Sequence, residues 1–440
     1  MTPDDNSVSN ALLPNPNPDT GPDDRVDRIL DAVREHLGVE IAFVSRYIDE
    51  DRELMNVRSD LDLPMGPGYR EPKENGYCWH VLQGNLPELI QDPADFPFTE
   101  EFAITKMLPV GCHLNVPLRL ADGSVYGSFC ALSRKPDRSM TERDLGVVRA
   151  FAQLAAEQIE TTLEEDTRRS TLHKTISQLI SGDRLTIVHQ PIHSLDSNEP
   201  VGVECLARFP DAGSRGPDQW FDEAEEVGLG TELEMLAVRS ALATLPYVPE
   251  GHYMSVNASP ATIISGALEQ ALGDSDGDRL VIEVTEHQQV EDFQALADAL
   301  RWIGPKAKIA IDDVGAGYAG LRHIVDLEPD ILKLDMSLTR DIHRNPARRA
   351  LAAAMVAFSN EIGCKLIAEG IENEQERNTL QELGVTMGQG YFFSKPLPVI
   401  ASQQWLMQNR GIMVDEDTVF AAKPIDPSQG EDIAELRLRA

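Results

Sequence analysis

The stretch IAIDDVGAGY, residues 309–318, determines how the second half of this sequence is interpreted. An apolar run leads into two adjacent aspartates, Asp312 and Asp313, and glycines follow at positions 315 and 317. The pattern predicts a buried strand that ends in carboxylates and then turns sharply. Two interpretations compete, because such glycines can cradle a dinucleotide phosphate, whereas paired aspartates can hold metal ions.

Short apolar runs of this kind alternate with helical stretches over residues 181–411, which predicts a (β/α)8 barrel. The runs are LTIVHQ, PVGVECLARF, YMSVNAS, RLVIEVTE, AKIAIDD, DILKLD, CKLIAEGIE and GVTMGQGYFF. In such a barrel the reactive residues lie where the strands end. Polar residues recur at these ends: Glu204, Arg208, Asn257, Glu283, Glu286, Asp312, Asp313, Lys333, Asp335, Glu369, Glu372 and Gln389.

A single polar residue at a strand end usually faces solvent or caps the next helix. A whole series of them predicts a shared site, where converging carboxylates would repel one another unless cations intervene. Carboxylate and amide oxygens suit Mg²⁺, Mn²⁺ or Ca²⁺. Adjacent aspartates can each serve a different ion, as in two-metal phosphoryl chemistry.

The dinucleotide interpretation rests on GAGYAG, residues 315–320, with an acidic residue, Asp335, twenty positions after the first glycine. We reject it because two aspartates directly before the glycines would repel a pyrophosphate, and because the neighbouring runs do not form a doubly wound pattern. The glycines instead predict an active-site loop with unusual backbone angles.

The composition limits the classes of partner. The formal net charge of −34 over 440 residues argues against binding to DNA or RNA polymers. Five scattered cysteines without a CxxC pair argue against a disulfide framework or a zinc–cysteine site. The acidic N-terminus does not resemble a signal peptide, and no apolar run has the length of a membrane span. We therefore expect a cytoplasmic protein that does not enter a membrane.

The first domain is predicted at residues 25–160. An amphipathic helix at 26–38 is followed by a strand at 41–48, and a hairpin at 113–132 turns at Asp122–Gly123 before a closing helix at 141–160. This order, and NVPLRLADGSVYGSFCALS in particular, resembles a GAF domain. The resemblance implies an α+β sensory module with an antiparallel sheet, which can bind an unidentified small molecule or only dimerise.

The remaining segments are a disordered tail at 1–24, a linker helix at 161–180 and an acidic tail at 412–440. The linker helix extends an apolar stripe that includes Val148, Phe151, Ala155, Ile159 and Leu163. It is interpreted either as a dimer-forming helix that carries a signal or as a helix packed only on its own domain. Charges at 164–169 interrupt the stripe, and the two interpretations stay open.

The barrel motifs, taken together, resemble the EAL domain of cyclic di-GMP phosphodiesterases. The motifs in order are QPI, ECLAR, SVNAS, IEVTE, DDVGAGYAGL, LKLD, AEGIE and QGYFFSKPLP, between about residues 185 and 398. The resemblance implies a TIM-like barrel whose first strand is antiparallel to the rest. It also implies hydrolysis of cyclic di-GMP to linear pGpG with two Mg²⁺ or Mn²⁺ ions, inhibition by Ca²⁺, and a homodimer.

The resemblance further implies a role for each residue that matches a motif. The metal ligands would be Glu204, Asn257, Glu283, Asp312, Asp313 and Glu369. Glu204, Lys333 and Glu369 would act in catalysis, with Lys333 near the attacking water and Glu369 also proposed as a base. The substrate would contact Gln190, Arg208, Gln389 and Pro396. Glu286 would anchor the glycine loop, and Glu372 would support the site from behind.

Several positions depart from the family pattern. The name-giving Glu-Ala-Leu reads Glu204-Cys205-Leu206, where Cys205 is expected to be a small buried residue that points away from Glu204. Val314 and Ala316 replace the usual Phe and Thr of the glycine loop, which could lower activity. His287 is expected at the surface.

In the first domain, Cys112-His113 is similar to a bilin-attaching pair, but its place in a strand favours a core cysteine. The role of Cys78 and His80 is undecided.

Three functions are compared. An active phosphodiesterase regulated by its GAF domain is favoured, because no expected metal ligand is missing. The alternative is a catalytically inactive EAL-type receptor that binds cyclic di-GMP. A third function, a metal-assisted barrel enzyme that forms an enolate, leaves QPI and KPLP unexplained.

Overall fold

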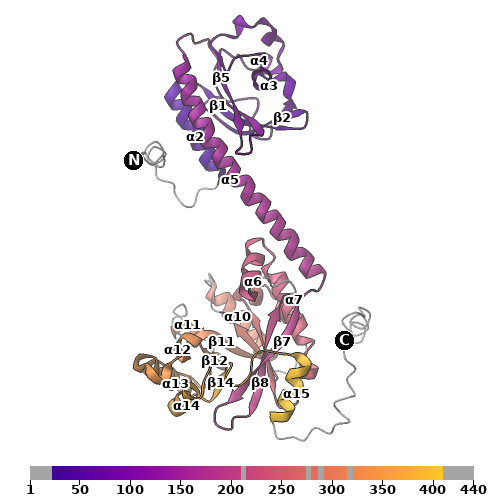
Figure 1. Cartoon of the computed structure of the whole chain (residues 1–440), viewed down its shortest axis with the longest axis vertical. Coiled ribbons are helices and arrows are strands. Elements are labelled where there is room, and N and C mark those ends of the chain that lie inside the picture. Colours follow the sequence, from indigo (N-terminus) through magenta and orange to yellow (C-terminus); the bar gives the residue numbers. More distant parts are fainter. Residues whose placement is uncertain (1–21, 210–214, 274–278, 286–291, 315–320, 410–440) are drawn as a thin grey trace. The chain divides into compact units, whose positions relative to one another are not determined.

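The computed structural model describes residues 22–209, 215–273, 279–285, 292–314 and 321–409. By its internal contacts the chain divides into two compact units, with a boundary after Ser170. Each unit has a sheet with helices packed against it (Figure 1). Within the described residues, no helix is both long enough and apolar enough to cross a membrane.

The first unit is built on a six-stranded antiparallel sheet with the order β3-β2-β1-β6-β5-β4. The strands are β1 (Ile41–Ile48), β2 (Asp51–Ser59), β3 (Arg70–Pro72), β4 (Leu89–Ile90), β5 (Cys112–Arg119) and β6 (Val125–Ser133). Strands β5 and β6 form the hairpin predicted around Asp122–Gly123, and Gly123 has the left-handed φ of +82° that such a turn needs.

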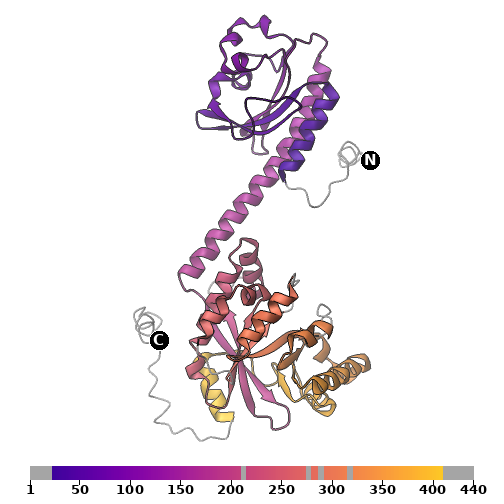
Figure 2. The ribbon, with the colours of Figure 1, turned by 180° about the vertical axis from the view of Figure 1, so that it is seen from behind.

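Helices cover the two faces of this sheet differently. Helices α2 (Pro22–Leu37) and the first part of α5 (Glu142–Ser181) pack side by side on one face (Figure 1, Figure 2). The other face is covered by short elements: α3 (Tyr77–Leu82), α4 (Ala103–Met107), η1 (Lys73–Asn75), η2 (Pro93–Asp95) and η3 (Pro97–Glu101). Because residues alternate along a strand, Cys112 faces α2 and α5, whereas His113 faces α3.

The closing helix and the linker helix of the sequence form one continuous helix, α5, of 40 residues. Its first part is buried against the sheet through Val148, Ala152 and Ile159. Its last turns are buried through Leu172 and Ile176 in an apolar cluster with α6 and α7 of the second unit. Residues 163–171 between these two parts are exposed. The packing at both ends therefore explains why the charged segment can interrupt the apolar stripe.

The second unit is a closed eight-stranded barrel, as predicted. Parallel strands β8 to β14 follow one another, and β7 closes the barrel by pairing antiparallel with both β8 and β14. A ninth, two-residue strand, β15 (Leu397–Pro398), pairs with β7. The barrel strands are β7 (Thr186–Ser194), β8 (Pro200–Arg208), β9 (Tyr253–Ala258), β10 (Leu280–Val284), β11 (Lys308–Val314), β12 (Ile331–Leu334), β13 (Lys365–Ala368) and β14 (Met387–Gln389).

Helices surround the barrel and bury its outer face in the main apolar core (Figure 1). They are α6 (Pro217–Glu226), α7 (Gly230–Leu242), α8 (Pro260–Ile264), α9 (Ala267–Leu272), α10 (Phe293–Ile303), α11 (Leu321–Leu327), α12 (Met336–Thr339), α13 (Pro346–Ile362), α14 (Glu374–Leu383) and α15 (Val399–Asn409), with η4 (Leu245–Tyr247) and η5 (Ile342–Arg344). Cys205 lies in this core, opposite to Glu204, as expected from strand alternation.

Candidate active site

The interior of the barrel consists of an apolar layer followed by a polar one. A small apolar cluster inside the barrel contains Ile192, Val281, Ala310, Ile331, Ile367 and Met387. Two residues further along most of these parallel strands, side chains of the same orientation are polar: Glu283, Asp312, Lys333, Glu369 and Gln389. The strand period therefore places polar side chains together at the carboxyl ends of the strands, above an apolar floor.

Lys333 lies at the centre of this polar layer. Its side chain is fully buried, and its Nζ lies 2.7 Å from Glu283 Oε2 and 2.6 Å from Glu369 Oε1. Asp312 Oδ1 is 3.1 Å from the same ammonium, and Glu204 Oε2 is 3.8 Å from it. One lysine from β12 thus brings together carboxylates from β8, β10, β11 and the end of β13.

The pKa values follow from this excess of negative charge in a buried place. Burial, together with the nearby carboxylates, raises the pKa of Glu283 to about 8, although Lys333 opposes the rise. Burial likewise raises the pKa of Glu369 well above its ordinary value. Burial on its own would lower the pKa of Lys333, but the surrounding carboxylates raise it well above the ordinary value. The carboxylates around Lys333 therefore favour its charged form.

Amide side chains hold Glu204 from two sides. Asn257 Nδ2 donates to Glu204 Oε1 at 3.1 Å, and Gln389 Nε2 donates to Glu204 Oε2 at 2.5 Å. Gln389 also donates to Gln190 Oε1 at 3.1 Å, and Gln190 in turn donates to the carbonyl of Ser394. These bonds connect β7, β8, β9 and β14 across the barrel and fix the orientation of the Glu204 carboxylate.

The two adjacent aspartates reach the site because β11 is irregular. Consecutive residues on a regular strand point to opposite faces, but the register of β11 with β12 shifts between Ile311 and Val314. Asp313 adopts a left-handed φ of 54°, and its N–H donates to Asp312 Oδ1. Carboxylate oxygens of Asp312, Asp313 and Glu369 consequently lie within 4.8 Å of one another.

The other predicted site residues lie further from this centre. Arg208 is half-buried and donates to the carbonyl of Ala207. Glu372 is exposed and pairs with Arg340 at 3.3 Å. Pro396 is half-buried directly before β15. Glu286, Ala316, His287 and the glycine loop at 315–320 lie outside the described residues, whereas Val314 is buried.

The donor set fits divalent cations. One ammonium faces four carboxylates, and burial together with the neighbouring carboxylates raises the pKa values of Glu283 and Glu369. Carboxylate oxygens with an amide carbonyl are the ligands that Mg²⁺ and Mn²⁺ prefer. Bound cations would neutralise the excess charge that Lys333 alone does not.

Two further residues shape the site and carry no signal in the sequence pattern. The hydroxyl of Thr339 donates to the backbone carbonyl of Glu369 and so ties α12 to the end of β13. The Tyr253 hydroxyl is buried in the barrel without a hydrogen-bond partner among the described residues. Burial and the charge of Glu283 raise the pKa of Tyr253. Gly202 makes room for this ring, since a Cβ there would lie 2.8 Å from it.

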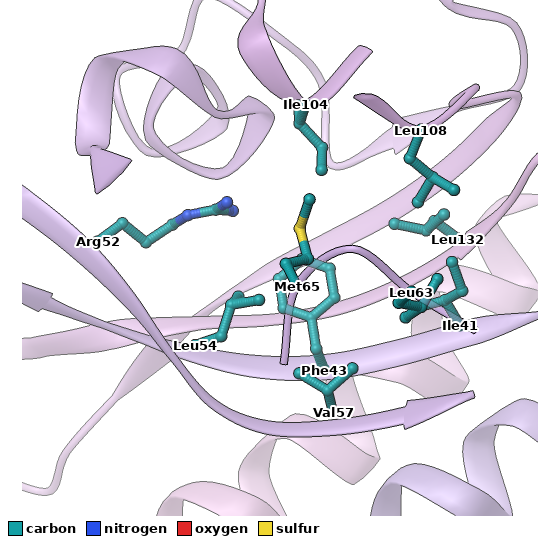
Figure 3. A pocket seen from close by; sticks show the side chains of 10 residues that line it. All are labelled: Ile41, Phe43, Arg52, Leu54, Val57, Leu63, Met65, Ile104, Leu108 and Leu132. Atoms are coloured by element: carbon teal, nitrogen blue, oxygen red, sulfur yellow. The ribbon is translucent and has the colours of Figure 1, made fainter. Parts of the chain in front are cut away.

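The first unit contains a small apolar pocket between its sheet and the short elements that cover it (Figure 3). Its walls are mostly aliphatic, with one cationic exception, Arg52, whose guanidinium points into the pocket in Figure 3. The lining residues are Ile41, Phe43, Arg52, Leu54, Val57, Leu63, Met65, Ile104, Leu108 and Leu132. Its free volume of about 20 Å³ is room for about one water molecule, so the pocket is closely packed in this structure.

Family models match both parts of the chain. A model described as EAL domain matches residues 173–396, slightly more than half of the chain, and a model described as GAF domain matches residues 19–160. A solved structure of the EAL enzyme Bd1971, in a cGMP-bound form, covers 84% of this chain and 93% of its own at 19% identity and a TM-score of 0.51. At this identity the likeness concerns the fold.

Curated proteins are similar to this chain in sequence over part of their length. The probable cyclic di-GMP phosphodiesterase PdeB of Escherichia coli strain K12 is 27% identical over 320 residues, which cover 70% of this chain and 56% of PdeB. The cyclic di-GMP phosphodiesterase PA2567 of Pseudomonas aeruginosa is 31% identical over 255 residues, 54% of this chain and 43% of the relative. The chain thus spans about half the length of these relatives.

Proposed function

Because the chain belongs to the EAL domain family of cyclic di-GMP phosphodiesterases and has a GAF domain before its EAL domain, we propose that it hydrolyses cyclic di-GMP to linear pGpG. The observation that supports this most is the ring of carboxylates around Lys333 at the carboxyl ends of the barrel strands. In the proposal, two Mg²⁺ or Mn²⁺ ions supply Lewis-acid activation of water and offset phosphate charge.

The chain's own residues would have separate roles in metal binding, charge stabilisation and substrate binding. Glu283 and Asp312 would hold one ion together with Glu204 and Asn257. Asp313 would hold the second, and Glu369 would serve the metal site. Lys333 would keep a fixed positive charge near the reacting phosphate, which stabilises charge that develops in the transition state. Gln190, Arg208, Gln389 and Pro396 would orient the substrate, and Arg208 would have to leave the carbonyl of Ala207 to reach a phosphate oxygen.

The direct test is an activity assay on the purified chain. It would be incubated with cyclic di-GMP and Mg²⁺ or Mn²⁺, and the nucleotides would be separated by chromatography. We expect pGpG to appear only with metal, and Ca²⁺ to inhibit. Tight binding of cyclic di-GMP without any pGpG would contradict the proposal and would identify the chain as an inactive receptor.

The raised pKa of Glu283 predicts that metal binding is coupled to the release of protons. With a pKa of about 8, this carboxyl is mostly protonated at pH 7 in the metal-free protein, and it must lose its proton to bind a cation. Because the pKa of Glu369 is raised as well, Mn²⁺ binding at pH 7 should release at least one proton, and the apparent affinity should rise as the pH is raised from 6.5 to 8. Calorimetry in two buffers of different ionisation enthalpy would measure the release, and an affinity independent of pH between 6.5 and 8 would contradict the prediction.

Regulation by the GAF domain is part of the same proposal. An unidentified small-molecule ligand of the GAF domain would have to enlarge the apolar pocket next to Arg52, which has a free volume of only about 20 Å³. A homodimer is expected from the family resemblance. Activity of the chain with and without residues 1–170 would show whether the first unit changes the rate, because Leu172 and Ile176 belong to the apolar cluster of the second unit. Light scattering during size-exclusion chromatography would measure the oligomeric state.

A further inference from the structure

Three side chains with soft donor atoms meet on the inner face of the GAF sheet. Cys78 comes from α3, His113 from β5 and Cys130 from β6. One donor atom from each lies within 4.8 Å of the other two, and all three residues are at most 2% exposed. The sulfur atoms of Cys78 and Cys130 are 3.2 Å apart. The cluster is separate from the carboxylates of the barrel, because it lies entirely within the first unit.

His113 is the residue of this cluster that indicates a bound ligand. Its Nδ1 is buried and has no hydrogen-bond partner among the residues that the structure describes. The only aromatic neighbour recorded for its ring in those residues is Tyr77, at a centroid distance of 5.2 Å. Buried polar atoms of this kind are rare and call for a missing partner. Thiol contacts and ring packing do not provide one.

We propose that Cys78, Cys130 and His113 form a binding site for a thiophilic divalent metal ion, with Zn²⁺ as the natural class. Thiolate sulfur and imidazole nitrogen are the donors that Zn²⁺ prefers, at about 2.3 Å and 2.0–2.1 Å. Tetrahedral geometry at these lengths separates two sulfur atoms by about 3.8 Å, so the two thiols would move apart by only about half an ångström. Three protein ligands leave a fourth position open to water or a small ligand.

The charges around the cluster support the site. Arg52 Nη1 is 3.2 Å from Cys78 Sγ, and Arg52 also forms a buried ion pair with Glu71. A guanidinium beside a sulfur atom favours its thiolate form, which is the form that binds metal. Since Arg52 and Glu71 neutralise each other, two thiolates would leave excess negative charge in a buried place, and a divalent cation would cancel it.

A disulfide between Cys78 and Cys130 is the competing explanation for their short separation. A disulfide needs the sulfur atoms at about 2.05 Å, and it would leave the imidazole of His113 without a partner. A metal ion accounts for all three residues at once. The soft donor set also distinguishes this site from the oxygen ligands of the barrel, where Mg²⁺ and Mn²⁺ are expected.

Cobalt provides the test, because Co²⁺ bound to thiolate has a charge-transfer absorption that oxygen ligands do not give. The full chain, freed of metal under reducing conditions, would be titrated with Co²⁺ in excess Mg²⁺. We expect a thiolate–cobalt band that saturates at one equivalent and disappears when Zn²⁺ is added. Cys78→Ser, Cys130→Ser and His113→Ala should each weaken Co²⁺ binding by about 100-fold or more, since even loss of an outer partner costs 10–100-fold.

Cys112→Ser is the matched control. Cys112 is as buried as Cys130 and directly precedes His113, but it faces the opposite side of the sheet, so its variant should keep the band. A wild-type chain without the band would overturn the proposal, whether or not the variants fold. So would the loss of two of the five thiols in the unreduced chain, with a Cys78–Cys130 cross-linked peptide and no cobalt binding. Neither result depends on phosphodiesterase activity.

Discussion

Glu204→Gln is expected to reduce the turnover of cyclic di-GMP by about 10³-fold or more while the fold is kept. Glu204 lies on β8, is 6% exposed and accepts hydrogen bonds from Asn257 and Gln389. Glutamine has nearly the same shape, so packing should survive. It lacks the negative charge that a divalent cation requires, and metal stabilisation of transition-state charge is worth several kcal/mol, or about tenfold in rate for each 1.36 kcal/mol.

The measurement combines the rate of pGpG formation with Mn²⁺ binding by calorimetry and with the thermal unfolding curve. Glu382→Gln is a suitable control, because it removes the same charge from the same unit at an exposed position of α14. If Glu204→Gln turned over substrate at the wild-type rate, Glu204 would not be a metal ligand. A variant that loses both Mn²⁺ binding and turnover but unfolds at the wild-type temperature would support the proposed role.

The convergence of the strand ends could be predicted from the sequence, because it follows from the period of a strand and from the barrel. Glu283, Asp312 and Glu369 each follow a short apolar run, and parallel strands bring their carboxyl ends to one rim. The distances to Lys333 place these carboxylates together. Their roles as metal ligands remain predictions, since they depend on ions and substrate and not on the fold alone.

Features that depend on irregular backbone or on tertiary contacts could not be predicted in the same way. Asp312 and Asp313 reach one site only through the bulge in β11. The strand period places Lys333 in the polar layer, but its contacts with four carboxylates from separate strands depend on the tertiary structure. In the first unit, the sequence favoured a core position for Cys112, next to His113, and left the roles of Cys78 and His80 undecided. The alternation of β5 separates Cys112 from His113 and brings His113 to Cys78 and Cys130.

Lys333→Met is expected to destabilise the metal-free barrel by about 3–5 kcal/mol, the range found when one partner of a buried ion pair is removed. The side chain is fully buried, and its Nζ contacts carboxylates of Glu283, Asp312 and Glu369. Methionine fills a similar volume, so the loss should be electrostatic. It leaves the carboxylates without their only close cation among the described residues.

Two conditions should reduce the loss of stability in Lys333→Met. Both distinguish an electrostatic effect from a packing defect. Lowering the pH from 8 to 6 lets protons replace the missing ammonium, because carboxylates that repel one another have raised pKa values. Saturating Mn²⁺ should also reduce the difference in unfolding free energy between Lys333→Met and wild type, since divalent cations would neutralise the same carboxylates. Turnover should stay low under both conditions if Lys333 is needed near the phosphate.

Denaturant unfolding of the metal-free chain at pH 6 and pH 8, with and without Mn²⁺, measures these differences. Lys365→Met is the control, because Lys365 lies on the neighbouring strand β13 with its side chain exposed, and removing it should change stability little. A Lys333→Met protein as stable as wild type at pH 8 without metal would mean that the carboxylates do not need the ammonium. A loss that is equal at both pH values and unaffected by Mn²⁺ would indicate a packing defect and would contradict the electrostatic role of Lys333.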